Sequence, residues 1–347
     1  MSDLDINSDD NSGGRRFEWM CDPPCDEGHS IELYRNGYHA ELDSGSTFYQ
    51  IFEPQTSEND NTAVQPRLIQ HLDHGRRLNR DKIVLCMHGI SWWSFSYHRS
   101  VQPLVQQGYT VILFDFYGRG RSQMNDVDAV CNLEYFCNQA YELLNYLNVD
   151  RVHLVGYSMG GAVATRFTVV HSARVAQLCL VGPAIVPVPM PLVAKLMVLP
   201  YIGRFLFNLF GARAMVAKLD TERFKFDIAQ PENVDPLLID DLIAKVKWQI
   251  LLKPSFLPAF YSTIYNIPFA YGLLHLLPLI QDDIPVGVVL GKRDVVVPYE
   301  LAKSLITHHL PRSRMISVDC GHAFTVEAPE QFATSIIKLL DNRSDDE

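Results

Sequence analysis

The fold is decided by one stretch of the sequence, Val152-His153-Leu154-Val155-Gly156-Tyr157-Ser158-Met159-Gly160-Gly161. A short apolar run leads into a turn in which Ser158 stands between two glycines. Gly156 and Gly160 lack the Cβ atoms that would block a tight strand-to-helix turn, so the pattern predicts a nucleophile elbow. Because a serine hydroxyl is a weak nucleophile by itself, the motif predicts a histidine base and an orienting acid elsewhere in the chain.

The composition of the 347 residues is that of a folded protein, with 47% hydrophobic, 11% aromatic and 20% charged residues. The formal net charge of −10 and an isoelectric point near 5.6 argue against nucleic-acid partners, which need a basic face. Seven cysteines and an N-terminus without an apolar signal segment favour an intracellular, cytoplasmic location. Cys21, Cys25 and His29 have no second ligand pair at zinc spacing, so we expect neither a metal nor a cofactor.

Short, almost entirely apolar segments alternate with helix-length stretches, which predicts the α/β class with a mostly parallel central sheet flanked by helices. The predicted strands are residues 83–87, 110–114, 152–155, 177–181, 285–290 and 314–318. We assign residues 36–183 and 281–342 to this core. Residues 184–280 interrupt the alternation with apolar helical material and predict an inserted cap, or lid. Residues 1–35 predict a polar tail.

The sequence predicts further elements of the core on the N-terminal side of the elbow. Residues 38–54 contain two strand-like pieces around Asp43-Ser44-Gly45-Ser46, which predicts a hairpin, and the polar residues 55–81 predict a surface loop. Residues 131–147 carry one apolar stripe at helical spacing and predict a helix packed on the sheet.

Two later strands end in chemically useful side chains. Residues 286–294 lead into Asp294, and the strand at 315–318 leads into His322. Ligand chemistry in open α/β sheets gathers at the carboxyl ends of the strands, so both side chains are expected near Ser158. Asp319 is the rival acid, but no strand-to-turn register places it across from the imidazole.

The sequence resembles the α/β-hydrolase superfamily at four separate motifs. They are His88-Gly89-Ile90, Asp115-Phe116-Tyr117-Gly118-Arg119-Gly120-Arg121-Ser122, the Ser158 elbow, and the pair Gly291-Lys292-Arg293-Asp294 and Gly321-His322. The chain order of nucleophile, acid and base is the one expected of that superfamily. The resemblance is to its capped branches: serine esterases, meta-cleavage-product hydrolases and monoacylglycerol-lipase-like members.

The resemblance implies acyl transfer in two steps, with Ser158 as nucleophile, His322 as base and Asp294 as the residue that orients the imidazole. It also implies an oxyanion hole formed by the backbone N–H groups of Ile90 and Met159. The tryptophans that follow the oxyanion loop, Trp92 and Trp93, are expected to line the acyl pocket, with plain core packing as an equal alternative.

The leading functional interpretation is a serine hydrolase, carboxylesterase-like or lipase-like, that cleaves a small-molecule ester with an apolar acyl group, such as a monoacylglycerol. The first alternative is carbon–carbon bond hydrolysis of the meta-cleavage type. That substrate carries a carboxylate and needs a pocket cation, for which the cap offers Lys195, Arg204 and Arg213. The second alternative is a non-catalytic binding protein on the same fold.

The sequence argues against a membrane-spanning helix and leaves peripheral membrane contact as an expectation. Two long uncharged stretches, residues 175–194 and 254–281, each contain four or more prolines, so no spanning helix is expected. Peripheral contact with a membrane surface through the cap remains an expectation to test. The natural substrate and the oligomeric state are left open by the sequence.

Overall fold

The computed structural model describes residues 36–56, 64–72, 82–189, 195, 198–199 and 202–341. The predicted tail 1–35, with Cys21, Cys25 and His29, lies outside these residues. Parts of the expected loop 55–81 and of the cap 184–280, and residue 342 of the core, also lie outside them.

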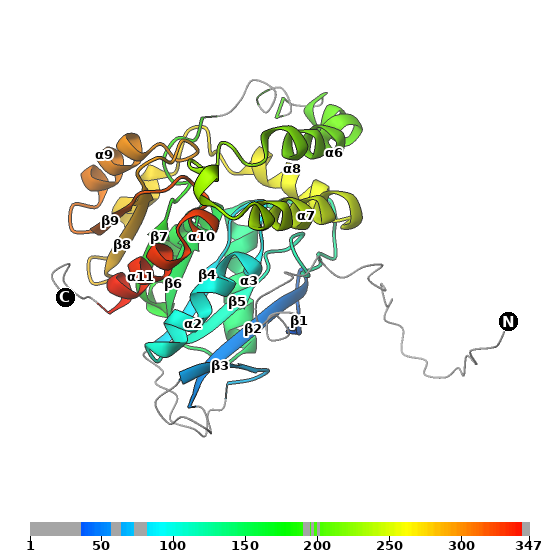
Figure 1. The fold of residues 1–347 in the computed structure, drawn as a ribbon. Helices are drawn as coiled ribbons and strands as arrows, with labels where there is room; N and C mark the ends of the chain where they lie inside the picture. Colours follow the sequence, from blue (N-terminus) through cyan, green and yellow to red (C-terminus); the bar gives the residue numbers. More distant parts are fainter. Residues whose placement is uncertain are drawn as a thin grey trace, which may run out of the picture.

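A nine-stranded sheet forms the centre of the molecule (Figure 1). Its order is β1-β2-β5-β4-β6-β7-β8-β9, and β3 pairs with β2 outside this path. The strands are β1 (Tyr38–Leu42), β2 (Gly45–Thr56), β3 (Val64–Ile69), β4 (Ile83–Met87), β5 (Thr110–Phe114), β6 (Val152–Tyr157), β7 (Val175–Val181), β8 (Val286–Gly291) and β9 (Arg314–Val318). All pairs among the strands from β4 to β9 are parallel. The predicted α/β class with a mostly parallel sheet is therefore confirmed.

The N-terminal hairpin contains one strand more than the sequence predicted. β1 and β2 pair antiparallel around Asp43 and Ser44, as expected, but the region predicted as a loop also contributes β3, which pairs with β2 from Ile51 to Thr56. The loop prediction was therefore wrong for residues 64–69. The strand contains Pro66, which is tolerated because β3 pairs with β2 alone among the described strands and so is an edge strand, where a missing N–H has no ladder partner to lose.

Helices cover both faces of the sheet. α3 (Leu133–Tyr146), α4 (Met159–Val170) and α9 (Tyr299–His309) share one apolar core with β4, β6 and β8. α2 (His98–Gln106) and α11 (Pro329–Leu340) share a second core with the opposite side chains of the same strands. Because β4 and β5 are buried on both faces, they are continuously apolar rather than alternating.

Residues between β7 and β8 form a separate helical layer. α6 (Ile202–Glu222), α7 (Pro236–Leu252) and α8 (Phe256–Asn266) contact one another and lie together above the strands in Figure 1. The short 3-10 helices η4 (Pro231–Asn233) and η5 (Leu274–Leu279) complete the segment. We keep the name cap for residues 184–280, of which all but 190–194, 196–197 and 200–201 are described.

Candidate active site

The turn between β6 and α4 holds Ser158 in a conformation that few residues adopt. Ser158 has φ 54° and ψ −118°, a positive φ that costs a non-glycine residue about 1–3 kcal/mol. A Cβ on Gly160 would lie 2.0 Å from the Met87 carbonyl oxygen, and one on Gly156 would lie 2.6 Å from the Gly160 carbonyl oxygen. Gly160 is therefore required for the close approach of the elbow to β4, and Gly156 for the tight turn from β6 into α4.

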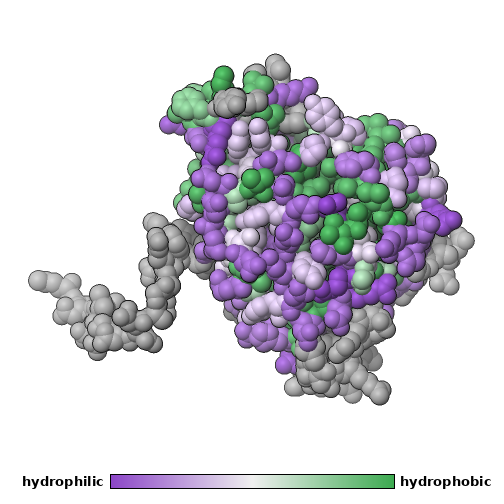
Figure 2. All heavy atoms as spheres, turned by 180° about the vertical axis from the view of Figure 1, so that it is seen from behind, coloured by the Kyte–Doolittle hydropathy of each residue, from purple (hydrophilic) through white to green (hydrophobic). Residues whose placement is uncertain are grey.

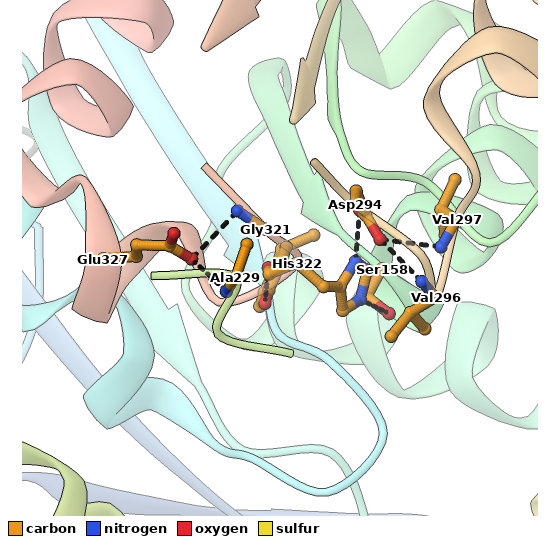
Figure 3. Close-up of polar contacts among 9 residues, drawn as sticks. Ser158, Ala229, Asp294, Val296, Val297, Gly321, His322 and Glu327 are labelled. Carbon is orange, nitrogen blue, oxygen red and sulfur yellow. Dashed lines mark hydrogen bonds and ion pairs between the residues drawn. The ribbon is translucent and has the colours of Figure 1, made fainter. Parts of the chain in front are cut away.

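The structure brings the three predicted side chains into one hydrogen-bonded chain (Figure 3). The Nε2 atom of His322 lies 2.9 Å from the Oγ atom of Ser158, and its Nδ1 atom lies 2.7 Å from Oδ2 of Asp294. The other oxygen of Asp294 accepts hydrogen bonds from the N–H groups of Val296 and Val297, at 2.9 and 2.8 Å. The carboxylate is thereby held in place before it meets the imidazole.

The rival acid is directed elsewhere. Asp319 is exposed and forms a two-pronged ion pair with Arg293, with N–O distances of 2.8 and 3.0 Å. Asp294, by contrast, is 4% exposed and contacts the imidazole directly. The geometry therefore favours Asp294 as the partner of His322.

Two carboxylates govern the protonation of His322. Burial lowers the pKa of this buried imidazole, but the carboxylates of Asp294 and Asp227 outweigh that effect, so its pKa is raised above the ordinary 6.5. Asp227 lies in the cap, and burial raises the pKa of its own carboxyl group. The surroundings of the imidazole are therefore anionic, a feature that sequence reasoning missed.

The predicted oxyanion-hole residues lie beside the elbow. Met159 is the first residue of α4, so its N–H has no acceptor within the helix. Ile90 follows Gly89, where an added Cβ would lie 3.5 Å from the Cβ of Ser158. The Nδ1 atom of His88 lies 2.8 Å from the Gly89 carbonyl oxygen. Because a trans peptide directs its N–H away from its carbonyl, this contact orients the N–H of Ile90 as well.

The role of His88 is set by its two ring contacts. Its Nε2 atom accepts a hydrogen bond from the N–H of Phe116 at 2.8 Å, which leaves Nδ1 as the donor to Gly89. Burial lowers the pKa of His88 to about 3, so the ring stays neutral. With both ring nitrogens engaged by the backbone and the ring neutral, His88 is a structural residue rather than a base.

A buried polar network that the sequence did not predict ties the cap to the oxyanion loop. Arg119 is fully buried and donates from Nε to the Ile90 carbonyl at 3.2 Å and from Nη2 to Thr263 of α8 at 2.7 Å. Gln249 of α7 donates to the Ser91 carbonyl at 2.8 Å. α7 therefore hydrogen-bonds directly to the loop that follows β4, and α8 is connected to it through Arg119.

The two tryptophans lie at the same junction. Trp92 is 5.6 Å from Tyr157 and Trp93 is 5.8 Å from Trp248 of α7, measured between ring centroids. Both tryptophans are buried. Their role as walls of an acyl pocket stays a prediction.

The cap cations proposed for a substrate carboxylate do not lie in the site. Lys195 and Arg213 are exposed, and Arg204 pairs with Asp128 at the surface. Three other cations of the described residues are buried: Arg119 and Lys253 donate to main-chain carbonyl oxygens, and Lys245 pairs with Asp241. Sequence reasoning could not have found where these cations lie, because their exposure depends on which face of each helix is covered.

Neither a metal cluster nor a spanning helix occurs in the described part of the chain. No group of three His, Cys, Asp or Glu side chains there could hold a metal ion. Within the same residues, no helix is long and apolar enough to cross a bilayer.

Comparison with known proteins finds hydrolases similar to this chain. A family model described as "Alpha/beta hydrolase family" matches residues 83–335. The 2-hydroxy-6-oxo-6-(2'-aminophenyl)hexa-2,4-dienoic acid hydrolase of Metapseudomonas resinovorans is 28% identical over 249 residues, which cover 71% of this chain and 79% of that protein. A 2-hydroxy-6-oxononadienedioate/2-hydroxy-6-oxononatrienedioate hydrolase of Pseudomonas sp is 26% identical over 270 residues, 76% of this chain and 89% of that protein.

Solved structures share the fold at lower identity. The enol-lactonase from Burkholderia xenovorans LB400 superposes with a TM-score of 0.66 at 15% identity, covering 88% of this chain and 100% of that chain. An esterase from Exiguobacterium antarcticum has the same TM-score at 17% identity and the same coverage. At these identities the likeness concerns the fold alone.

Proposed function

The chain belongs to the alpha/beta hydrolase family, and from that premise we propose that it is a serine hydrolase that cleaves a neutral carboxylic ester with an apolar acyl group. The observation that carries the proposal is the chain of two hydrogen bonds from Ser158 through His322 to Asp294, at 2.9 and 2.7 Å. A hydroxyl, a neutral imidazole and a held carboxylate in this order are the parts that acyl transfer needs.

The proposed mechanism begins at the hydroxyl of Ser158. His322 takes its proton at Nε2 as Oγ bonds to the ester carbonyl carbon, and the carbonyl electron pair moves to oxygen. Asp294 stabilises the imidazolium, and the N–H groups of Ile90 and Met159 stabilise the oxyanion; one such donor contributes about 3–4 kcal/mol. The oxyanion collapses and expels the alcohol, which takes the proton from Nε2. Water, activated by the same imidazole, then hydrolyses the acyl-enzyme.

The charges around His322 support a neutral substrate. The charged groups that act on the imidazole, Asp294 and Asp227, are both anionic, so a substrate carboxylate beside them would be repelled. Arg204 and the other cap cations named from the sequence are at the surface. We therefore rank ester hydrolysis above carbon–carbon bond hydrolysis for this chain, and both above a non-catalytic role.

The relatives' names favour the second candidate, carbon–carbon bond hydrolysis of a dienoate. The two candidates differ in the substrate's charge, so they can be compared directly. We expect kcat/KM for p-nitrophenyl butyrate to exceed that for 2-hydroxy-6-oxo-6-phenylhexa-2,4-dienoate. The opposite ranking would make the chain a carbon–carbon hydrolase in spite of its anionic site.

Ester hydrolysis itself is tested with Ser158→Ala. Wild-type protein should release p-nitrophenol from short-chain or medium-chain esters, and a fluorophosphonate should label Ser158. The variant should lose both, while Ser304→Ala, which removes an exposed hydroxyl on α9, should keep both. The proposal fails if wild type leaves p-nitrophenyl esters and monoacylglycerols untouched and no fluorophosphonate labels Ser158.

We further propose that the cap touches an anionic lipid surface through α6. Ile202, Phe205 and Leu209 lie one helical turn apart and are 59%, 66% and 55% exposed, and hydrophobic side chains gather on this projecting part of the molecule (Figure 2). No Asp or Glu occurs from residue 151 to 219, and Arg213 is exposed on the same helix, whereas Arg204 pairs with Asp128. The positive charge of Arg213 next to the apolar row complements anionic lipid although the whole chain carries −10.

Vesicle sedimentation tests this surface. Wild type should pellet with vesicles that contain phosphatidylglycerol, more weakly with pure phosphatidylcholine, and less as salt rises. Phe205→Asp combined with Leu209→Asp should abolish pelleting, while Val295→Asp, at an exposed apolar residue after β8, should not. Equal pelleting of wild type and the double variant would overturn the proposal.

A further inference from the structure

His322 lies on a short loop that is linked to the cap on both sides of the histidine, directly at Ala323 and through Glu327 at Gly321. We call residues 319–323 the histidine loop and residues 223–230, which join α6 to η4, the cap turn. The histidine loop follows β9, and the cap turn approaches it from above the sheet. The contacts between these two segments are independent of the Arg119 network at the oxyanion loop.

The first connection runs through Glu327, the last residue of α10 (Phe324–Glu327). Its Oε2 atom accepts hydrogen bonds from the N–H of Gly321 at 2.9 Å and of Ala229 at 3.0 Å (Figure 3). Its Oε1 atom accepts one from the N–H of Gln230 at 3.0 Å. One carboxylate thus holds the residue before His322 and two residues of the cap turn. Hydrogen bonds to an ionised acceptor are about twice as strong as neutral ones.

The second connection lies on the other side of His322. The N–H of Ala323 donates to the carbonyl oxygen of Asp227 at 2.7 Å. The approach is so close that a Cβ on Gly321 would lie 2.6 Å from that same oxygen and 2.9 Å from the Ala229 nitrogen. Residue 321 must therefore be glycine for the two segments to meet as they do.

The cap turn adopts a backbone that needs such support. Arg223 and Phe224 have φ values of 46° and 59°, and each left-handed non-glycine residue costs about 1–2 kcal/mol. Ile228 of the same turn is 1% exposed and belongs to the apolar core that contains Phe324 and Phe332. Burial of Ile228 and the contacts of Glu327 together offset the strain, so the turn is held against the histidine loop.

We propose that Glu327 is a positioning residue that couples the docked cap turn to the placement of the His322 imidazole on Ser158. The inference rests on the proposed function, because it assigns a role relative to the Ser158–His322 pair. Glu327 touches neither of these side chains in the structure; it acts through the backbone of Gly321. Loss of its carboxylate leaves three N–H groups without their acceptor and frees the histidine loop on the side of Gly321.

Release of the cap turn has a measurable electrostatic signature. The imidazole is faced by Asp294 from the turn after β8, by Asp227 from the cap turn and by the Tyr157 ring from β6, at a centroid distance of 5.4 Å. Burial lowers the pKa of His322 and Asp227 raises it, so withdrawal of the cap turn changes both contributions and shifts that pKa. Because the neutral imidazole is the base, the acidic limb of activity moves with the pKa.

The experiment measures the rate at which a fluorophosphonate labels Ser158 between pH 5 and 9 in the full-length chain, together with kcat and KM for p-nitrophenyl butyrate. In Glu327→Ala, labelling and kcat should fall by about 10- to 100-fold at pH 8, as expected for a misplaced catalytic group, with KM within about twofold of wild type. The acidic limb of this variant should differ in position from that of wild type. Glu327→Gln, which keeps one acceptor oxygen, should have a labelling rate and a kcat between those of wild type and Glu327→Ala.

Two further variants separate positioning from folding. Asp227→Asn keeps the backbone acceptor for Ala323, so it should move the acidic limb to lower pH with little loss of rate at pH 8. Glu330→Ala, at an exposed acid on α11, is the matched control and should behave as wild type. Thermal melts of each variant give the folded fraction.

The outcomes distinguish this inference from the proposed function. If wild type is labelled but folded Glu327→Ala is labelled equally fast with an unchanged limb, the inference is wrong and the proposed function stands. It is also wrong if the loss in Glu327→Ala and Glu327→Gln equals the loss of folded protein. If wild type hydrolyses no ester but is labelled, the labelling rates still decide the inference. If wild type is not labelled at all, the inference falls with the proposed function.

Discussion

The sheet and the cap of this protein are built from apolar residues in opposite ways. All five residues of β4 and of β5 are buried, whereas α6 buries only Gly203, Phe207 and Gly211 among its 21 residues. The sheet is stabilised by helices on both faces, so every side chain of its inner strands contributes apolar burial. α6 leaves a row of apolar side chains outside.

The difference extends to the chemistry. Ser158, Asp294 and His322 each follow the carboxyl end of a parallel strand, so the sheet register alone brings them together. The cap contributes through a few backbone and polar contacts at Gln249, Thr263 and the turn that contains Asp227. The comparison indicates that the core positions the reacting groups, whereas the cap contributes polar contacts and charge around them. The following variants test each of these two roles.

The largest expected effect is on the core's catalytic chain. Asp294→Asn should lower kcat by about 10⁴-fold, because the amide favours the wrong imidazole tautomer and cannot stabilise an imidazolium. Asp319→Asn should change kcat by less than about twofold, because its side chain is exposed and pairs with Arg293. Ester turnover by the two variants decides which acid serves His322. Equal losses would remove the distinction drawn from the geometry.

The next effect contrasts the same substitution in the two regions. Leu154→Ala in β6 removes a fully buried side chain and should lower the free energy of unfolding by about 2–5 kcal/mol. Leu209→Ala in α6 removes a side chain that is 55% exposed and should change it by less than about 0.5 kcal/mol. Urea unfolding measures both. A large loss for Leu209→Ala would mean that a covered surface has been mistaken for an exposed one.

The pH dependence of wild-type activity reports the combined influence of core and cap on His322. Asp294 from the core and Asp227 from the cap raise the pKa of the imidazole, so the acidic limb of kcat/KM should lie above pH 6.5. The neutral imidazole is the active base, so activity is retained above the raised pKa and falls tenfold per pH unit below it. An acidic limb below pH 6.5 would show that burial lowers the pKa of His322 more than the two carboxylates raise it.

The smallest effect concerns two glycines. Gly211→Ala in α6 places a methyl group 3.0 Å from the edge of the Phe207 ring, which can yield, and should stabilise the helix by up to about 1 kcal/mol. The matched core change, Gly160→Ala, drives a Cβ to within 2.0 Å of the Met87 carbonyl oxygen and should destabilise instead. Thermal melts that ranked the two variants in the opposite order would contradict the close approach of the elbow to β4.

Most of the core could be predicted because its signals are local. The predicted strands 83–87, 110–114 and 314–318 have the bounds that the structure gives them, since short apolar runs covered on both faces are readable without tertiary knowledge. β3 was missed because it lies within a polar segment, and its pairing with β2 is a contact between separate segments that local sequence does not reveal.

The sequence by itself determined the fold class, the Ser158 elbow and the order in which Asp294 and His322 follow it, because each is encoded within a few neighbouring residues. Only the tertiary structure decided that Asp319 turns to Arg293, that Asp227 faces the imidazole and that Glu327 joins the cap turn to the histidine loop. These contacts join residues from different segments of the chain. Their existence depends on how closely two backbones approach, and that distance is set by packing rather than by any local pattern.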